Sequence, residues 1–588
     1  MRPINALVLF FFLLCLDAMS RQAGQPSPQA ASETSQRAQP VAAEPALPTP
    51  QPSQPTRTQP NSRAQAEPTT MDQVVDRIIE REHHLMNLLQ DRTPVVETYL
   101  QNMTPDAQLG PVPKDDRYFL GRMDLSESIN RKDYMKQPSM ERRLLGGFTK
   151  FFKVAYRPLG FAWMIVADRN DFDRQHYDFR YAHREFLGDV RCLVFDVTPR
   201  KNAGKGRFLG RIWVEDQSFN IVRLNGTFAP RPRSGYFFHM DSWRLNLVPE
   251  YWVPAYIYSE EGDFNAGAKN QIAFKAQTRL WGYNLKSGRE EEELTQIRVD
   301  SNVRDESPTA QDAAPLQAEH EWQQQAADNV LERLQKAGLV APLGDVDKIL
   351  QTVVNNLEIT NHVELSPPVG TRVLLTTPLE TFSVGNTIVI SRGLIDVLPD
   401  ESSLAMVLAH ELAHIVLGHN AYSQYAFNDR MLFSDESVYS NLGFRHTAAE
   451  EAAADTKAIE LLNNSPYGQK LGSAGLFLKA LEASAPHLPA LLTSLLGNNV
   501  SEKGAVTRMS ALIKSAPALE VNKLDQVAAL PLGGRVKING WDDRIELTKS
   551  QPVALTSARD KQPFEVTPFF PHLSRIDSGN TSSTVGQR

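Results

Sequence analysis

Cysteine is almost absent from this chain, with only Cys15 and Cys192 among 588 residues. This excludes a disulfide-stabilised scaffold and a cysteine-rich structural zinc module. Positive charge is not in excess either, because 62 basic side chains stand against 69 acidic ones and leave a net charge of −7. The composition therefore gives no sign of nucleic-acid binding. Long apolar runs are also lacking, and the mean hydropathy of −0.35 excludes a polytopic membrane protein.

Aromatic residues are missing from residues 21–70, where ten prolines stand among Gln, Ala, Ser and Thr. Such a stretch cannot bury enough apolar surface to offset the entropy that is lost on ordering. We therefore expect a disordered, Pro/Gln/Ala-rich linker over 21–70.

The first 20 residues have the pattern of an export signal. Arg2 precedes an apolar run over Ala6–Leu16, and small residues around Ser20 suit a signal peptidase. The run is shorter than the roughly 20 residues that span a bilayer. We expect a cleaved signal peptide at 1–20 and a periplasmic or secreted protein. The alternative is an uncleaved signal that anchors the protein to a membrane.

Polar breaks divide the rest of the chain, which is too long for one hydrophobic core. The stretch 301–320 is polar and lacks any periodicity, and the end of the chain is polar again. We therefore predict a folded domain at 71–300, a linker at 301–320, a second folded domain at 321–515 and a largely irregular C-terminal extension at 516–588.

The first folded part begins with an apolar helical stripe at 72–90 and continues from about 117 to 285 in short alternating segments. Strands with no helical pattern between them predict an antiparallel sheet that curves like a half-barrel. The predicted strands are Phe151–Tyr156, Arg191–Val197, Phe208–Glu215, Phe219–Phe228, Ser242–Val248, Tyr251–Tyr258 and Ile272–Tyr283. This pattern resembles the periplasmic lipoprotein carriers, which implies a groove for lipid or extended polypeptide. A structural or docking module is the alternative.

The most informative segment is 402–419, which reads SSLAMVLAHELAHIVLGH and should be helical after a Ser402 cap. His410 and His414 are four residues apart, so both imidazoles lie on one face, as binding one zinc ion requires. Glu411 is rotated by about 100° from His410. It can reach a water molecule beside the metal and act as a general base.

A hydrolytic zinc site also needs a third protein ligand and an open fourth position. His419 lies nine residues after His410, on the opposite helical face, and is better placed to complement the helix C-terminus. The alanine-rich segment 447–462 offers Glu451 and Asp455, which share a face. A Glu on that face could bind the metal, while Asp455 hydrogen-bonds a ligand imidazole.

The HELAH motif at 410–414, followed by Glu451 and Asp455, resembles the zinc metallopeptidases grouped with the CAAX prenyl protease, HtpX and BepA. The likeness covers about 322–515 and includes a run of strand, hairpin, short helix and active-site helix. The resemblance implies one zinc ion per chain with the ligands His410, His414 and Glu451, the base Glu411 and the supporting residue Asp455.

One feature departs from the pattern of this family. Its members usually carry a His a few residues before an Arg, after the glutamate helix, to steady the transition state. Arg508 matches that Arg and would contact the transition state or the substrate, but residues 498–509 contain no His. Either another donor takes this role or turnover is weak.

Together these features predict an α+β protein. A mainly helical zincin metalloprotease domain with a small β-hairpin or sheet follows an antiparallel, half-barrel-like β domain. We expect an exported zinc metalloendopeptidase that acts on unfolded or misassembled envelope polypeptides in protein quality control, with peripheral membrane association left open and no nucleic acid partner. The rivals are a zinc-binding chaperone or assembly factor with little proteolysis, and a lipid or lipoprotein carrier that acts through its β domain.

Overall fold

The chain forms two units, Met1–Ala66 and Glu67–Arg588, and every residue described below belongs to the second. The computed structural model describes residues 68–106, 110–126, 130–134, 158–229, 238–249, 251–261, 274–285, 315–419, 442–502, 504–519, 536–538, 545–547, 564–568 and 570–576. The predicted signal peptide at 1–20, nearly all of the predicted linker at 21–70 and the predicted strand Phe151–Tyr156 lie outside the described residues. No helix among the described residues combines the length and hydropathy that a bilayer crossing requires.

Helix α2 (Met71–Leu89) confirms the helical stripe predicted at 72–90. Thr70 and Gln73 form a capping box, which satisfies backbone N–H groups at the helix start. The apolar stripe is buried, with Ile78 and Leu89 fully inaccessible. It packs into one core with the large sheet, which explains why a helix with such a polar outer face is stable.

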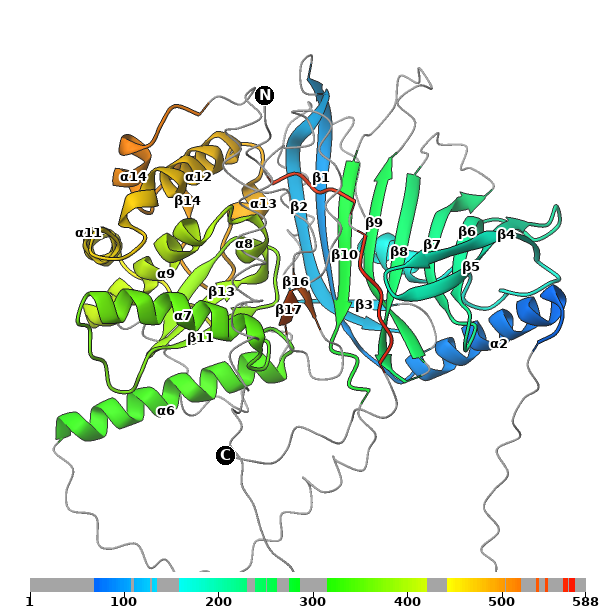
Figure 1. Ribbon diagram of the computed structural model, residues 1–588, viewed down its shortest axis with the longest axis horizontal. Helices are drawn as coiled ribbons and strands as arrows, with labels where there is room; N and C mark the ends of the chain where they lie inside the picture. Colours follow the sequence, from blue (N-terminus) through cyan, green and yellow to red (C-terminus); the bar gives the residue numbers. More distant parts are fainter. Residues whose placement is uncertain are drawn as a thin grey trace, which may run out of the picture. The chain divides into compact units, whose positions relative to one another are not determined.

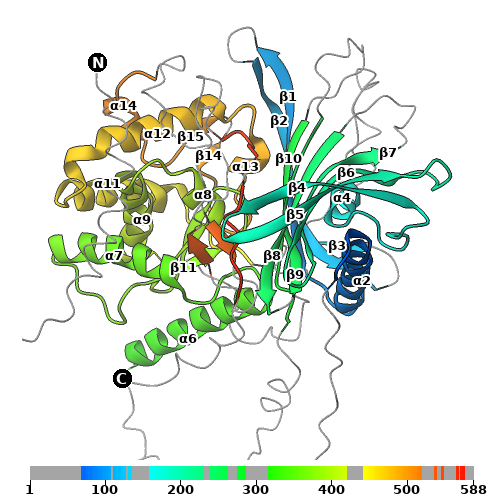
Figure 2. The same cartoon turned by 45° about the vertical axis from the view of Figure 1, so that its right-hand side comes forward.

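Ten strands form one open antiparallel sheet in the order β3-β2-β1-β10-β9-β8-β7-β6-β5-β4 (Figures 1 and 2). The strands are β1 (Val95–Asp106), β2 (Gly110–Asp124), β3 (Asn130–Asp133), β4 (Tyr177–Leu187), β5 (Val190–Pro199), β6 (Arg207–Glu215), β7 (Ile221–Ala229), β8 (Phe238–Val248), β9 (Tyr251–Glu261) and β10 (Phe274–Trp281). Between β3 and β4 lie the short helix α4 (Pro158–Ala162) and the 3-10 turn η1 (Trp163–Ile165). The antiparallel sheet and the α+β class are as predicted.

The sheet begins at Val95, not near residue 117, and none of the predicted strands lies within β1, β2, β3 or β4. For β1 the reason lies in its polar residues. Glu97, Thr98 and Gln101 are buried at no more than 1% exposure, although their polarity hides the alternation expected of a strand. Partners far away in the sequence compensate these polar groups.

The two faces of the sheet belong to different cores, because successive side chains of a strand point to opposite sides. Val96 and Leu100 belong to the core that contains α2. Val95 and Tyr99 belong to the other core, which continues into residues of the second folded part. That second face is rich in aromatic side chains, namely Tyr99, Trp213, Trp243, Trp252, Tyr256, Tyr258 and Trp281.

The second part is mainly helical, as predicted, around a small sheet of order β11-β13-β12. Its elements are α6 (Pro315–Lys336), α7 (Asp345–Thr360), β11 (Gly370–Leu374), β12 (Thr381–Val384), β13 (Thr387–Ser391), α8 (Arg392–Val397), α9 (Glu401–Val416), α11 (Ala448–Asn463), η4 (Gly468–Lys470), α12 (Leu471–Ser484), α13 (Pro489–Leu492), β14 (Ser501–Glu502), β15 (Ala505–Val506) and α14 (Ser510–Ser515). A turn with Gly385 at a φ of 55° joins β12 to β13.

Two stretches predicted to be irregular contain structure. Helix α6 begins at Pro315, inside the predicted linker 301–320. In the predicted C-terminal extension, β16 (Val536–Ile538) pairs with β17 (Ile545–Leu547), and the segment 564–576 buries apolar side chains against the large sheet. The segment 564–576 lacks a periodic pattern because contacts with distant residues, not local periodicity, hold it in place. The boundaries at 71–300 and 321–515 stay predictions.

Buried polar contacts join the sheet to the helical part. The carboxylate of Glu97 accepts hydrogen bonds from the Thr377 backbone N–H at 2.6 Å and its hydroxyl at 2.8 Å, and from Arg392 at 2.5 Å. Asp116 on β2 likewise accepts the backbone N–H groups of Ala490 and Leu491 at 2.7 and 2.8 Å. The two parts therefore share both an apolar core and a set of buried charges.

We expect Glu97→Ala to lower the free energy of unfolding by about 3–5 kcal/mol, because it leaves the Arg392 guanidinium buried without its counter-charge. Urea denaturation measures the change. Asp178→Ala is the matched control, since Asp178 pairs with Arg200 at 3.0 Å on the surface and its loss should cost less than about 1 kcal/mol. Equal effects of the two substitutions would contradict a stabilising role for the Glu97 junction.

Candidate metal centre

Helix α9 carries the HELAH motif through the middle of the core. Its N-cap is Asp400, which accepts a hydrogen bond from the Ser403 N–H at 2.8 Å, so the helix begins slightly before the Ser402 cap expected from the sequence. Leu408, Ala409, Leu412 and Ala413 are fully buried, and so is His414, while His410 is 2% exposed. Polar groups held in such surroundings need partners.

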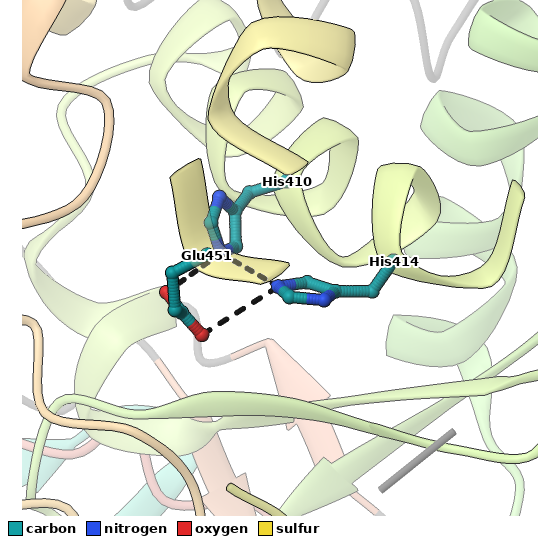
Figure 3. A group of neighbouring side chains, drawn as sticks. All are labelled: His410, His414 and Glu451. Carbon is teal, nitrogen blue, oxygen red and sulfur yellow. Dashed lines mark hydrogen bonds and ion pairs between the residues drawn. The ribbon is translucent and has the colours of Figure 1, made fainter. Parts of the chain in front are cut away.

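Those partners come from helix α11, which begins at a capping box. The Thr447 backbone N–H donates to Glu450 at 2.8 Å, and the Glu450 N–H donates to the Thr447 hydroxyl at 3.3 Å. Glu450 is thus engaged at the helix start. Glu451 follows about 100° further around the helix, and it faces the two histidines of α9 (Figure 3).

His410, His414 and Glu451 present one ligand atom each to a common point (Figure 3). The two Nε2 atoms are 3.2 Å apart, and the carboxylate oxygens of Glu451 lie 3.3 Å from Nε2 of His410 and 3.5 Å from Nε2 of His414. Tetrahedral ligands at about 2.0–2.1 Å from a zinc ion are separated by about 3.3–3.4 Å. The donor set and its spacing therefore fit one zinc ion.

The second nitrogen of each imidazole also has a neighbour. His410 Nδ1 lies 3.0 Å from Asp455 Oδ1, and the other oxygen of Asp455 accepts the Met509 N–H at 2.8 Å. A carboxylate at Nδ1 favours the tautomer whose Nε2 lone pair is free for a metal. Burial and the Arg508 charge lower the pKa of His410, but Asp455 and Glu451 outweigh them, and the net shift is upward. The site thus favours positive charge.

His419 lies close to the metal centre, contrary to its expected place on the opposite helical face. The helix ends at Val416, and Gly418 at a φ of 68° turns the chain back. His419 Nδ1 then lies 3.1 Å from Nδ1 of His414. A rotation of 100° per residue holds only inside a continuous helix, and α9 ends before His419. His419 can orient His414, as Asp455 orients His410.

Glu411 lies beside the triad and is fully buried. Its Oε1 accepts hydrogen bonds from the Thr381 hydroxyl at 2.7 Å and from Arg508 Nη1 at 3.0 Å. Its Oε2 has no hydrogen-bond partner among the described residues. Burial opposes ionisation, but Arg508 and the histidines more than offset it and lower the pKa of Glu411. The result is a carboxylate with one oxygen held and one able to accept a proton.

Arg508, which was predicted to contact the transition state or the substrate, already makes contacts with three residues of the protein. Nη1 donates to Thr381 at 2.9 Å as well as to Glu411, and Nε forms an ion pair with Glu451 at 3.2 Å. The Arg508 side chain thus connects Glu411 to Glu451. It also lines a small apolar cavity beside His410, with walls from β12, α9 and α12.

His446 is a site residue that the sequence pattern did not reveal. Its ring stacks on that of His414 with a centroid separation of 3.9 Å, and neither ring nitrogen has a partner among the described residues. Burial first, and His414 next, lower the pKa of His446 to about 4, so the ring is neutral. Asn498 holds the backbone of His446 at both N–H and C=O. His487, by contrast, contacts the Lys114 carbonyl on β2, away from this cluster.

Comparison with known proteins agrees with the geometry. Residues 379–470 match the family model described as Peptidase family M48, and this range contains the whole triad and Glu411. The match confirms the resemblance of this segment to metallopeptidases. No curated protein matches the chain.

Two solved structures are similar to part of the chain. One is a LolA superfamily protein from Nitrosomonas europaea, with 12% identity, a TM-score of 0.19 and coverage of 36% of this chain and 92% of that one. The other is a putative outer membrane lipoprotein-sorting protein domain from Vibrio parahaemolyticus, with 10% identity, a TM-score of 0.18 and coverage of 35% and 91%.

Proposed function

We propose that this protein is a zinc-dependent metalloendopeptidase that hydrolyses bonds within polypeptides. The observation that carries the proposal is the spacing of 3.2–3.5 Å among the ligand atoms of His410, His414 and Glu451, with the free oxygen of Glu411 beside them. The match to a peptidase family over 379–470 supports the same activity.

A bound zinc ion would polarise the scissile carbonyl and lower the pKa of a water molecule. Glu411 accepts the proton of the attacking water at Oε2 and passes it to the nitrogen of the leaving amine. Thr381 and Arg508 hold Oε1, so the carboxylate keeps one orientation through both proton transfers. Asp455 and His419 keep the two imidazoles turned toward the metal position.

The test is metal analysis of the purified protein together with cleavage of an unfolded substrate such as reduced casein. We expect one zinc ion per chain, internal cleavage products, loss of cleavage after chelation and recovery on adding zinc. Zinc binding without cleavage of any unfolded polypeptide would favour the chaperone or assembly role instead. Cleavage that survives complete removal of the metal would overturn the proposal.

His446 is the candidate for the donor that residues 498–509 lack. We expect His446→Ala to lower kcat by about 10²-fold, the usual effect of removing one donor to a developing oxyanion, while zinc content stays the same. The measurement is kcat on a short peptide beside the metal content. His487→Ala is the control and should change neither. An unchanged kcat for His446→Ala would assign the ring only a packing role against His414.

We further propose that the protein works outside the cytoplasm in quality control of envelope polypeptides. The support is the signal-like pattern of residues 1–20 and the tether-like composition of 21–70. Fractionation of expressing cells, with N-terminal sequencing of the mature protein, tests this proposal. Recovery in the cytoplasm with an intact N-terminus would contradict it.

A further inference from the structure

The C-terminal segment 564–576 crosses the aromatic face of the large sheet, as the red trace in Figure 1 shows. Phe564, Val566 and Leu573 are fully buried there. The described residues 564–568 and 570–576 form no helix or long strand of their own. Contacts with the sheet therefore hold this segment in one conformation, as a receptor holds a bound peptide.

The sheet recognises the backbone of this segment. Gln101, which is itself fully buried, donates from Nε2 to the Phe564 carbonyl at 2.7 Å and accepts the Val566 N–H at 2.9 Å. The Asp189 N–H donates to the Leu573 carbonyl at 2.8 Å, and the Ile576 N–H donates to Asn246 Oδ1 at 2.7 Å. Contacts of this kind bind a polypeptide with little regard to its side chains.

Other contacts select side chains. Lys275 on β10 pairs with Glu565, and Arg575 pairs with Glu215 at 2.6 Å. Phe570 remains 41% exposed, with its ring 5.9 Å from that of Trp243 in an edge-on arrangement. The site thus prefers apolar residues on both sides of an acidic one, with a basic residue further along.

Gly188 leaves room for the segment. It adopts a φ of +67°, and a Cβ atom at this position would lie only 2.5 Å from the Leu573 N and 2.6 Å from its carbonyl oxygen. A close approach of two backbones requires a residue without a side chain. The sheet is therefore shaped for a polypeptide backbone at this point.

One end of the segment reaches the helical part. The ring of Phe564 packs edge-on against Phe477 of α12, with centroids 6.1 Å apart. Phe477 also lines the cavity beside His410. Phe564 itself has a φ of 64°, which is uncommon for an aromatic residue and weakens the hold of the resident segment.

We propose that this face of the sheet is a binding site for extended polypeptide and that residues 564–576 are its resident ligand, which an incoming polypeptide replaces. An acyl chain is a poorer occupant, because it would leave Oε1 and one N–H of the Gln101 amide buried without partners, while the other N–H keeps the Tyr99 hydroxyl at 3.1 Å. The site adds to the proposed peptidase activity, since binding here needs neither metal nor hydrolysis. It would bring a substrate to the wall of the catalytic cavity.

The test uses the complete chain carrying Glu411→Gln, with a recognition sequence for a specific protease inserted between residues 555 and 556. After cleavage, a labelled synthetic peptide of residues 561–578 is added and its anisotropy is followed. We expect the peptide to replace the cut segment and to bind at least about 100-fold more tightly than to uncut protein. The uncut chain holds its own segment at a millimolar effective concentration.

Two outcomes would overturn the proposal. If an excess of peptide never displaces the cut segment, the segment is a permanent part of the fold. If oleate or phospholipid vesicles displace the cut segment while reduced casein does not, this face of the sheet binds lipid. A peptide with Phe564→Ser and Val566→Ser should bind at least about 10-fold more weakly, since it loses two buried apolar side chains. Equal binding of both peptides would also contradict the proposal.

A substitution in the sheet tests the same contact from the other side. Gln101→Glu removes the donor to the Phe564 carbonyl and should weaken peptide binding at least about 10-fold. Arg180→Ala is the control. Arg180 lies on the exposed edge strand β4 and pairs with Asp196 of β5, so its substitution should leave peptide binding unchanged. If Gln101→Glu does not fold, the substituted peptide still decides the question.

Discussion

Glu411→Gln should retain zinc and lower kcat for peptide hydrolysis by about 10³-fold, as expected for removal of a general base. The glutamine oxygen can still accept from Thr381 and Arg508, so the side chain should keep its place. Its amide group then replaces Oε2, the oxygen without a partner, and cannot accept a proton. The measurements are metal content and single-turnover cleavage of a short peptide.

The exposed residue Glu364 provides the matched control, and Glu364→Gln should change neither zinc content nor rate. Cleavage by Glu411→Gln at the parent rate would disprove the assignment of the base. Loss of zinc on the same substitution would instead make Glu411 a ligand.

Glu451→Ala should weaken zinc binding by more than about 100-fold, while Glu450→Ala should change it only slightly. Loss of a supporting residue alone usually costs 10–100-fold in metal affinity, and Glu451 is one of the three proposed ligands. Competition with a chromogenic chelator measures the affinity. The neighbouring Glu450 completes the capping box of α11 with the N-cap residue Thr447, so its loss should lower the stability of this helix instead.

Similar losses of zinc affinity in the two variants, or a larger loss for Glu450→Ala, would move the ligand by one residue. The contact of Asp455 with His410 would then need another explanation, because Asp455 reaches His410 from the same face of α11 as Glu451. Thermal melting of each variant separates loss of the metal from loss of the helix.

Two pairs of site residues could be predicted because their geometry is local. Spacings of four residues place His410 beside His414 on α9 and Glu451 beside Asp455 on α11. Only the resemblance to the metallopeptidases implied that Glu451 meets the two histidines, because this contact joins two separate helices. His446 could not be found in this way, since it precedes the first turn of α11 and reaches His414 only through its contacts with Asn498. His419 was misplaced for a related reason, because the helix ends before it.

The sheet shows the same limit. Strands β5 to β10 follow apolar alternation and were predicted, whereas β1 buries Glu97 and Gln101. Several of their partners, namely Thr377, Arg392 and Phe564, lie 280 or more residues away, and such contacts leave no mark on the local pattern. A piece of the chain that begins at about residue 320 would lack Glu97, the counter-charge that Arg392 contacts in the complete chain.

The Glu97 junction also concerns when the enzyme becomes active. Glu97 holds Thr377, which lies four residues before Thr381, the residue that positions the base. These groups are separated by 280 residues, so this contact forms only after most of the chain has been synthesised and the sheet is complete. The proposed peptidase activity should consequently be absent from nascent and partly folded chains. A cell would thereby be protected from the proposed activity until folding is finished.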